Sequence, residues 1–167
     1  MQQTDPAWLS EARKWMGVAE IPGKKHNPVI RNWLIGLKAW WEDDETPWCG
    51  VFVAHCIRVS GRDLPKEWYR ARAWAAAGTK LERPAYGCIV VFSRDGGGHV
   101  GFVVGQDAAG NLLVLGGNQG NRVSVAAFSK SRVLAYVWPG DNGKSRLPLP
   151  HRYKLPVGRA AASKGEA

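Results

Sequence analysis

The sequence predicts an α+β fold, in which N-terminal helices pack on a roughly five-stranded, mainly antiparallel sheet. In the first half of the chain, apolar residues recur at helical spacing. In the second half they form short β-type runs that glycine-rich turns separate. Helices followed by a meander of strands are typical of the α+β class. A length of 167 residues, of which 45% are hydrophobic, fits one ordinary domain with its own core.

Each predicted helix has capping residues or a proline near its start and a glycine near its end. Four helices are expected, over residues 5–16, 27–37, 46–60 and 65–77. In the third, Thr46 suits the N-cap and Pro47 the first helical position. Cys49 is therefore expected at about the third position of that helix.

The predicted strands are short apolar runs of β-branched and aromatic residues, over residues 88–92, 100–104, 112–115, 123–125 and 133–137. Beyond residue 140 no periodic pattern continues, and residues 141–167 carry six Lys/Arg against two acids. We therefore predict a domain over residues 1–140 and a basic, flexible C-terminal tail over residues 141–167.

The net charge of +9 favours a polyanionic partner, whether nucleic acid, an anionic membrane face or the acidic bacterial envelope, although basicity can also serve solubility alone. No nucleic-acid-binding signature, zinc motif or apolar run of about 20 residues is present. The N-terminus lacks the charged and apolar regions of a secretory signal. Three irregularly spaced cysteines argue against a disulfide framework. We therefore expect a protein that is made in the cytoplasm.

Cys49 is the first candidate for chemistry. The unpaired N–H groups and positive dipole at a helix start lower the pKa of a thiol and favour the nucleophilic thiolate. Gly50 beside it has no side chain, so a substrate carbonyl could approach. The alternative is that Cys49 is a small buried hydrophobe, as free cysteines commonly are.

His99 lies between a glycine triplet and an apolar strand. Such a strand gives a catalytic base a rigid mount within reach of a thiol. A histidine at a strand start can also be an ordinary polar residue, but a capped cysteine upstream favours the catalytic interpretation. His55, six residues after Cys49, points about 240° away around the helix, so it is not expected to be the partner.

A third residue should orient the imidazole by accepting a hydrogen bond from its other ring nitrogen. The turn after the next strand reads Gly116-Gly117-Asn118-Gln119. Adjacent antiparallel strands would bring this turn beside His99. Asn118 is the predicted orienting residue and Gln119 the alternative, while a plain turn with no such role also stays open. The acidic run at residues 42–45 is read as a solvated loop, with calcium binding as the alternative.

This order of cysteine, histidine and polar residue resembles the CHAP (cysteine, histidine-dependent amidohydrolase/peptidase) and NlpC-type superfamily of papain-like cell-wall hydrolases. The closest resemblance is to compact phage endolysins and related bacterial hydrolases. The matching stretches span roughly residues 8–138 and lie at residues 8–14, 17–23, 44–53, 69–74, 98–101 and 116–119. Many CHAP members have Glu where Gly116 stands and Asp where Cys88 stands.

The resemblance implies a papain-like fold and hydrolysis of a peptidoglycan stem-peptide amide by Cys49, His99 and Asn118. Either an endopeptidase or an N-acetylmuramoyl-L-alanine amidase fits. We expect Trp48, Gly50 and Gln119 to contact the substrate, and we expect no cofactor, no metal and a monomer. Release through a holin-like pore or a secretion machine would bring the enzyme to the wall, as in a phage endolysin or antibacterial effector. The alternatives are an inactive peptidoglycan-binding protein and a cytoplasmic cysteine protease that acts on proteins.

Overall fold

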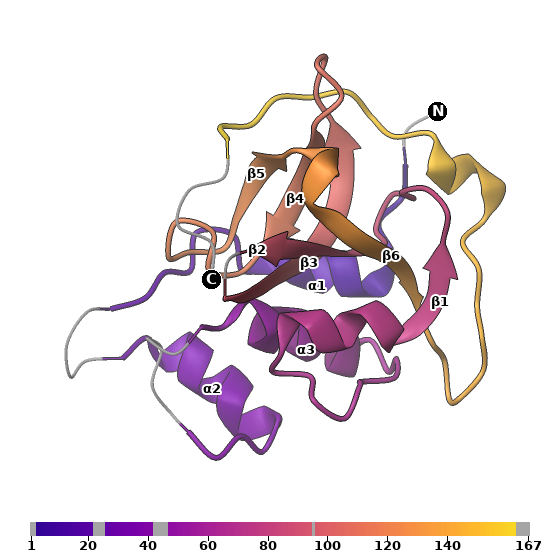
Figure 1. Cartoon of the computed structure of the whole chain (residues 1–167). Coiled ribbons are helices and arrows are strands. Elements are labelled where there is room, and N and C mark those ends of the chain that lie inside the picture. Colours follow the sequence, from indigo (N-terminus) through magenta and orange to yellow (C-terminus); the bar gives the residue numbers. More distant parts are fainter. Residues whose placement is uncertain (1–2, 22–25, 42–46, 95, 163–167) are drawn as a thin grey trace.

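The computed structural model describes residues 3–21, 26–41, 47–94 and 96–162. The predicted α+β class is confirmed (Figure 1). One antiparallel sheet follows three α-helices in the chain. The helices are α1 (Ala7–Lys14), α2 (Pro28–Gly36) and α3 (Cys49–Val59). Among the helices of the described residues, none has the length and apolar character that crossing a membrane requires.

The sheet has six strands rather than five, in the order β1-β6-β2-β3-β4-β5. Every neighbouring pair is antiparallel. The strands are β1 (Gly78–Leu81), β2 (Ile89–Arg94), β3 (Gly97–Gln106), β4 (Leu112–Gly116), β5 (Ser124–Phe128) and β6 (Val133–Pro139). The unexpected strand is β1, a short edge strand. It pairs with β6, where Thr79 lies opposite Trp138.

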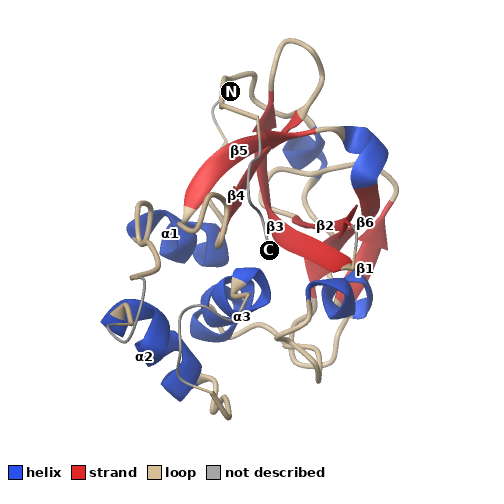
Figure 2. Ribbon diagram, turned by 60° about the vertical axis from the view of Figure 1, so that its left-hand side comes forward, coloured by secondary structure: helices blue, strands red, loops and turns tan. Residues whose placement is uncertain are grey.

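The three α-helices gather on one side of the sheet, as Figure 2 shows. Helix α3 is the central one, because it contacts α1, α2 and β3. All of its residues from Cys49 to Ile57 are buried. Burial of an entire helix surface is expected where neighbouring elements cover it on every side. The rigid surroundings of α3 hold its first residue, Cys49, in place against the sheet.

Two predicted helix starts differ in outcome. Asn27 caps α2 as expected, because its side chain accepts a hydrogen bond from Val29 N at 2.8 Å. Asp5 does not cap α1. Its carboxylate instead accepts hydrogen bonds from Tyr86 and Arg13 at 2.6 and 2.7 Å. Asp5 thus ties the start of the chain to the loop before β2.

The prediction of an α-helix over residues 65–77 is wrong. Turns occupy its first half, and a 3-10 helix, η1 (Ala71–Ala76), occupies the second. Trp74 of η1 is fully buried, and its Nε1 donates to Trp68 O at 2.9 Å. Packing of this segment against α3, β2 and β3 therefore overrides the helical pattern of its sequence.

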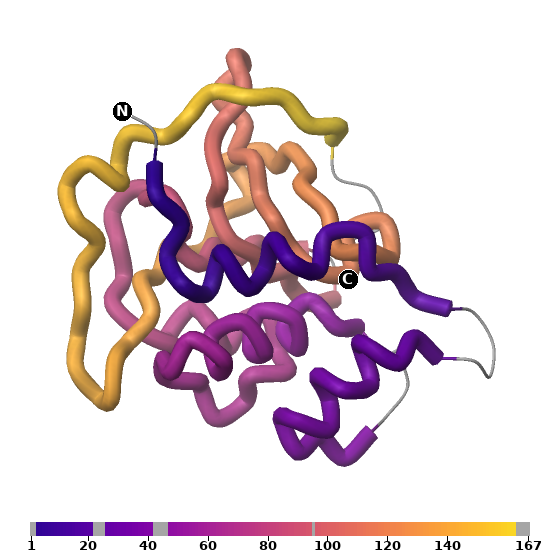
Figure 3. Tube along the Cα trace, turned by 180° about the vertical axis from the view of Figure 1, so that it is seen from behind, coloured from indigo at the N-terminus to yellow at the C-terminus, as the bar shows by residue number. Residues whose placement is uncertain are grey.

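The C-terminal segment crosses the sheet on the side away from the helices (Figures 1 and 3). Its described part contacts the domain at several points. Gln106 N donates to Pro156 O, and Gly158 N donates to Gln106 O, both at 2.9 Å. Tyr86 N donates to Arg152 O at 2.6 Å. The boundary at residue 140 and the mobility of this segment stay predictions.

Candidate active site

Cys49 is the first residue of α3, not the third. The N-cap is Trp48, and Pro47 precedes the helix. The predicted cap, Thr46, and the acidic run at residues 42–45 lie outside the described residues. This first position strengthens the expected lowering of the thiol pKa, because the first residue lies closest to the unpaired N–H groups of the helix start.

His99 lies near the start of β3 and is 0% exposed. Its ring stacks on Phe128 and on Phe92, with ring centroids 5.3 and 6.3 Å apart. The two aromatic rings come from β5 and β2, so three strands fix the plane of the imidazole. An imidazole held in this way keeps its orientation without help from a ligand.

The Cys49 thiol and the His99 ring form a hydrogen bond. Burial of the thiol raises its pKa, but this hydrogen bond and the charge interaction with His99 lower it. The N–H groups of Val100 and Gly50 also hydrogen-bond the sulfur. The net effect is a Cys49 pKa below the ordinary value of a thiol. The structure therefore brings together the two residues that the sequence analysis paired, and it favours the thiolate.

Gln119 contacts the other side of the imidazole. Its Oε1 lies 2.9 Å from His99 Nε2. Its Nε2 donates to Ser124 O at 2.8 Å and to Val114 O at 3.1 Å. These two carbonyls fix which end of the amide faces His99, so Oε1 accepts and His99 Nε2–H donates. The ring nitrogen that remains for the thiol is Nδ1, in its unprotonated form.

Asn118 does not make the contact that we predicted for it. The side chain is 2% exposed, and its Oδ1 accepts no hydrogen bond from the described residues. The backbone of Asn118 has a φ of 58°, in the left-handed region that Asn tolerates better than most residues. This turn directs the next residue back toward the sheet. The alternative, Gln119, is thus the residue that orients His99.

Two glycines make the Gln119 contact possible. A Cβ at Gly116 would lie 3.0 Å from Gln119 Cδ and 3.5 Å from His99 Nε2. A Cβ at Gly117 would lie 2.6 Å from Phe52 Cβ. The missing side chain at position 116 therefore leaves room for the amide of Gln119, and Gly117 lets the turn lie against α3.

The structure places two predicted substrate contacts differently. Trp48 is 1% exposed, and its Nε1 donates to Glu20 Oε1 at 2.7 Å, so its ring belongs to the core. Gly50 is buried, and a Cβ there would lie 2.8 Å from Trp68 O and 2.9 Å from Tyr69 O. Its missing side chain accommodates the protein backbone rather than a substrate carbonyl.

A cleft of about 400 Å³ opens beside Cys49. Its lining includes three arginines, Arg70, Arg72 and Arg94, and the glycines at 96–98. Arg72 Nε donates to Gly97 O at 2.9 Å, and Arg70 pairs with Glu67 at 3.0 Å. No role was predicted for these arginines from the sequence. For Arg70 and Arg72 the sequence signal was the alternation Tyr-Arg-Ala-Arg before Trp74, which indicates a polar face only once the fold is known, whereas Arg94 had no such pattern.

The other two cysteines differ from Cys49 in their electrostatics. Burial raises the pKa of Cys88 to about 12. Burial and the nearby Glu11 carboxylate raise the pKa of Cys56 well above its ordinary value. His55 is equally remote from the chemistry, because its Nε2 lies 3.0 Å from Glu11 Oε2 and its ring stacks on Trp33. Of the three thiols, Cys49 alone has a lowered pKa.

The helices precede the antiparallel sheet in the chain and pack on it, and a thiol at a helix start faces a histidine on a strand. This arrangement is that of a papain-like α+β fold. Residues 41–118 match the family described as CHAP domain, which confirms the superfamily that the sequence resembles. This type of domain is associated with peptidoglycan hydrolase, amidase or peptidase activity. No curated protein and no solved structure matches the chain.

Proposed function

We propose that this protein hydrolyses an amide bond of the peptidoglycan stem peptide through Cys49, His99 and Gln119. The observation that carries the proposal is the hydrogen-bonded chain from the Cys49 thiol through the His99 ring to Oε1 of Gln119. The Cys49 end of this hydrogen-bonded series lines a cleft large enough for a peptide segment. The series has the nucleophile, base and orienting residue that acyl transfer needs.

The first step forms a thioester. His99 takes the thiol proton, and the Cys49 sulfur attacks the amide carbonyl carbon. Backbone N–H groups at the start of α3 stabilise the oxyanion that develops. When the C–N bond breaks, His99 gives its proton to the leaving amine.

The second step releases the acyl group. His99 takes a proton from a water molecule, whose oxygen attacks the thioester carbon, and the C–S bond breaks. The stem fragment leaves as a carboxylic acid, and the thiol regains its proton from His99. Throughout both steps, Gln119 keeps the imidazole in the tautomer with its proton on Nε2, so that Nδ1 faces the sulfur.

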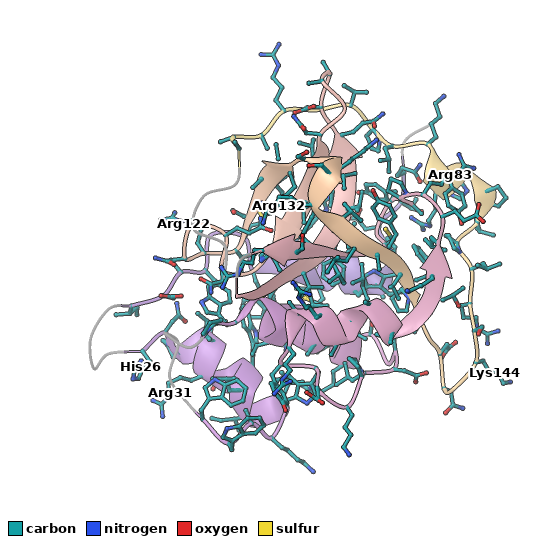
Figure 4. All side chains as sticks on the ribbon, in the orientation of Figure 1. His26, Arg31, Arg83, Arg122, Arg132 and Lys144 are labelled. Carbon is teal, nitrogen blue, oxygen red and sulfur yellow. The ribbon has the colours of Figure 1, made fainter. Side chains whose placement is uncertain are left out.

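The charges of the cleft suit an acidic substrate. Arg70, Arg72 and Arg94 line it beside Cys49, and stem peptides carry carboxylates next to their amide bonds. Other basic side chains, such as Arg83, Arg122 and Lys144, lie at separate places around the molecule (Figure 4). With a net charge of +9, the whole surface would attract anionic wall polymers, and salt would weaken this attraction. An endolysin or antibacterial effector, delivered to the wall by a holin-like pore or secretion machine, fits this chemistry.

Digestion of purified peptidoglycan by the wild type and by Cys49→Ala tests the proposal. We expect the wild type to release fragments whose new amino termini, read by mass spectrometry, identify the bond. Cys49→Ala should bind the wall and release nothing. Equal clearing by both proteins would remove Cys49 from the mechanism. Binding without cleavage by the wild type would indicate an inactive wall-binding protein, and cleavage of protein substrates alone would indicate a protease.

A further inference from the structure

A second hollow adjoins the cleft of Cys49, and the described residues that line it are uncharged and mostly aromatic. It has a volume of about 310 Å³ and is lined by Trp40, Trp41, Pro47 and Tyr69. Pro47 and Tyr69 also line the Cys49 cleft, so the two hollows share a wall. We call the side chains of Trp40, Trp41 and Tyr69 the aromatic shelf.

The rings of the aromatic shelf hold one another in place. Trp40 contacts Trp41 and Tyr69 edge to face, with centroids 4.6 and 4.8 Å apart. Trp41 in turn stacks on Trp68 at 6.0 Å, which connects the shelf to the core. Such contacts fix the orientation of flat rings before a ligand arrives, which lowers the entropy cost of binding.

Trp40 is the only tryptophan whose side chain is mostly exposed. It is 73% exposed, the largest value among the large hydrophobic residues of the described chain that lie at the surface. Packing of the fold therefore does not account for the position of Trp40. A large aromatic face that is both exposed and held in place indicates a binding surface.

The two hollows differ in chemistry. Among the residues that the structure describes, the shelf side has no charged lining residue, whereas the Cys49 side has three arginines. Peptidoglycan has the same division, because uncharged sugar rings are joined to a peptide that carries carboxylates. The C–H face of a pyranose ring packs well on a flat aromatic ring, and the carboxylates pair with guanidinium groups.

We propose that the aromatic shelf binds an N-acetylhexosamine ring of the glycan strand while the attached stem peptide enters the cleft of Cys49. This inference rests on the proposed function, and it extends that function from a peptide bond to a glycan-linked stem. It predicts that the enzyme prefers stems still attached to sugar over free stem peptides. Trp40, the most exposed ring, supplies the main stacking face.

The test uses the full chain with Cys49→Ala, so that binding is measured without turnover. A β-1,4-linked tetramer of N-acetylglucosamine, which has no peptide, is titrated into the ¹⁵N-labelled protein. We expect the indole N–H resonances of Trp40 and Trp41 to shift and that of Trp74, which is fully buried, to stay in place. Adding Trp40→Ala should weaken binding about tenfold, which corresponds to about 1.4 kcal/mol.

Two control variants separate stacking from unfolding. Trp40→Tyr keeps a flat ring and should bind within about threefold of the parent. Ile35→Ala removes another exposed apolar side chain, 58% exposed on α2, and should change nothing. Absence of any shift with the tetramer, or equal binding by the Trp40→Ala protein, would overturn the proposal. So would larger shifts of the same resonances with a sugar-free stem peptide.

The outcomes for the shelf and for the hydrolase are distinguishable. Suppose that the wild type digests peptidoglycan and Cys49→Ala does not, but the tetramer does not shift the indole resonance of Trp40. The proposed sugar site is then wrong, and the proposed hydrolase activity is supported. If the tetramer binds at Trp40 but no digestion depends on Cys49, the proposed hydrolase is wrong, and with it the claim that the sugar site serves catalysis.

Discussion

The amide oxygen of Gln119 lies 2.9 Å from Nε2 of His99, through space that Gly116 leaves open. Carboxylates commonly orient catalytic histidines, and here a neutral amide has that position. Two backbone carbonyls hold the amide so that its oxygen faces the ring. Gln119 can therefore set the tautomer of His99 without adding charge to the buried site.

Removal of the Gln119 amide should reduce turnover. In Gln119→Ala, the ring of His99 loses the acceptor that fixes its tautomer, and we expect kcat to fall roughly 10²-fold with little change in KM. Gln119→Glu should not restore it, because a carboxylate oxygen would then face the carbonyls of Val114 and Ser124. Asn118→Gly, which keeps the left-handed turn, serves as the control and should retain most activity. A large loss in Asn118→Gly with an active Gln119→Ala would show that the roles are reversed.

The free volume at Gly116 is a second point at which the same contact can be tested. In Gly116→Ala, the new methyl group would displace the Gln119 amide from His99, because its Cβ would lie 3.0 Å from Gln119 Cδ. We expect a fall in kcat similar to that of Gln119→Ala, and no further fall in the double variant. Steady-state kinetics of the four proteins measures this coupling. Additive losses would contradict a shared cause.

Alkylation should distinguish the three thiols. Because the pKa of Cys49 is lowered, its reaction with iodoacetamide should rise with pH to a midpoint below that of a free cysteine. In His99→Ala the hydrogen bond and charge interaction are lost while burial remains, so the midpoint should move up. Cys56 and Cys88, with raised pKa values, should react only after unfolding. Peptide mapping of the alkylated protein measures all three, and a Cys49 no more reactive than Cys88 would contradict the account.

Stability should fall in acid because of the buried pair of Glu11 and His55. Burial lowers the pKa of His55 below its ordinary value of 6.5, although Glu11 raises it in part. For Glu11, burial raises the pKa, but hydrogen bonds from Trp15, His55 and Lys14 outweigh it and lower the pKa below 4.5. Both groups therefore bind protons more weakly in the folded state than in the unfolded chain. The free energy of unfolding should decrease as pH falls through about 6.5 and again below about 4.5.

Urea unfolding between pH 7.5 and 4 measures this dependence. His55→Gln should show a smaller decrease in the upper part of the range, and Glu11→Gln a smaller decrease in the lower part. A stability that rises on acidification from pH 7 to 5.5 would contradict the direction of the His55 pKa shift, and one that rises as pH falls from 4.5 to 4 would contradict that of Glu11.

The parts of the site that the sequence could predict are those set by local structure. Cys49 and His99 each lie at the start of an apolar element, and a helix start or a strand start is readable from neighbouring residues. The choice between Asn118 and Gln119 is different, because it depends on the left-handed turn at Asn118 and on the space above Gly116. Neither feature follows from the spacing of residues alone.

Other differences come from contacts between distant parts of the chain. Trp48 was expected to contact the substrate, but packing on Trp33 and the hydrogen bond to Glu20 turn its ring inward. Strand β1 was missed because it is only four residues long and its partner, β6, lies more than 50 residues away. Short edge strands depend on such pairing more than on their own sequence.

The central claim is that a Cys49 thioester forms in the cleft. Wild-type protein is mixed with purified muropeptides, quenched with acid within one turnover, and its tryptic peptides are weighed by mass spectrometry. The account predicts an acyl adduct on the peptide that contains Cys49, more abundant when hydrolysis is slowed, and no adduct in His99→Ala. An adduct on another residue, or cleavage that continues undiminished in Cys49→Ala, would contradict it.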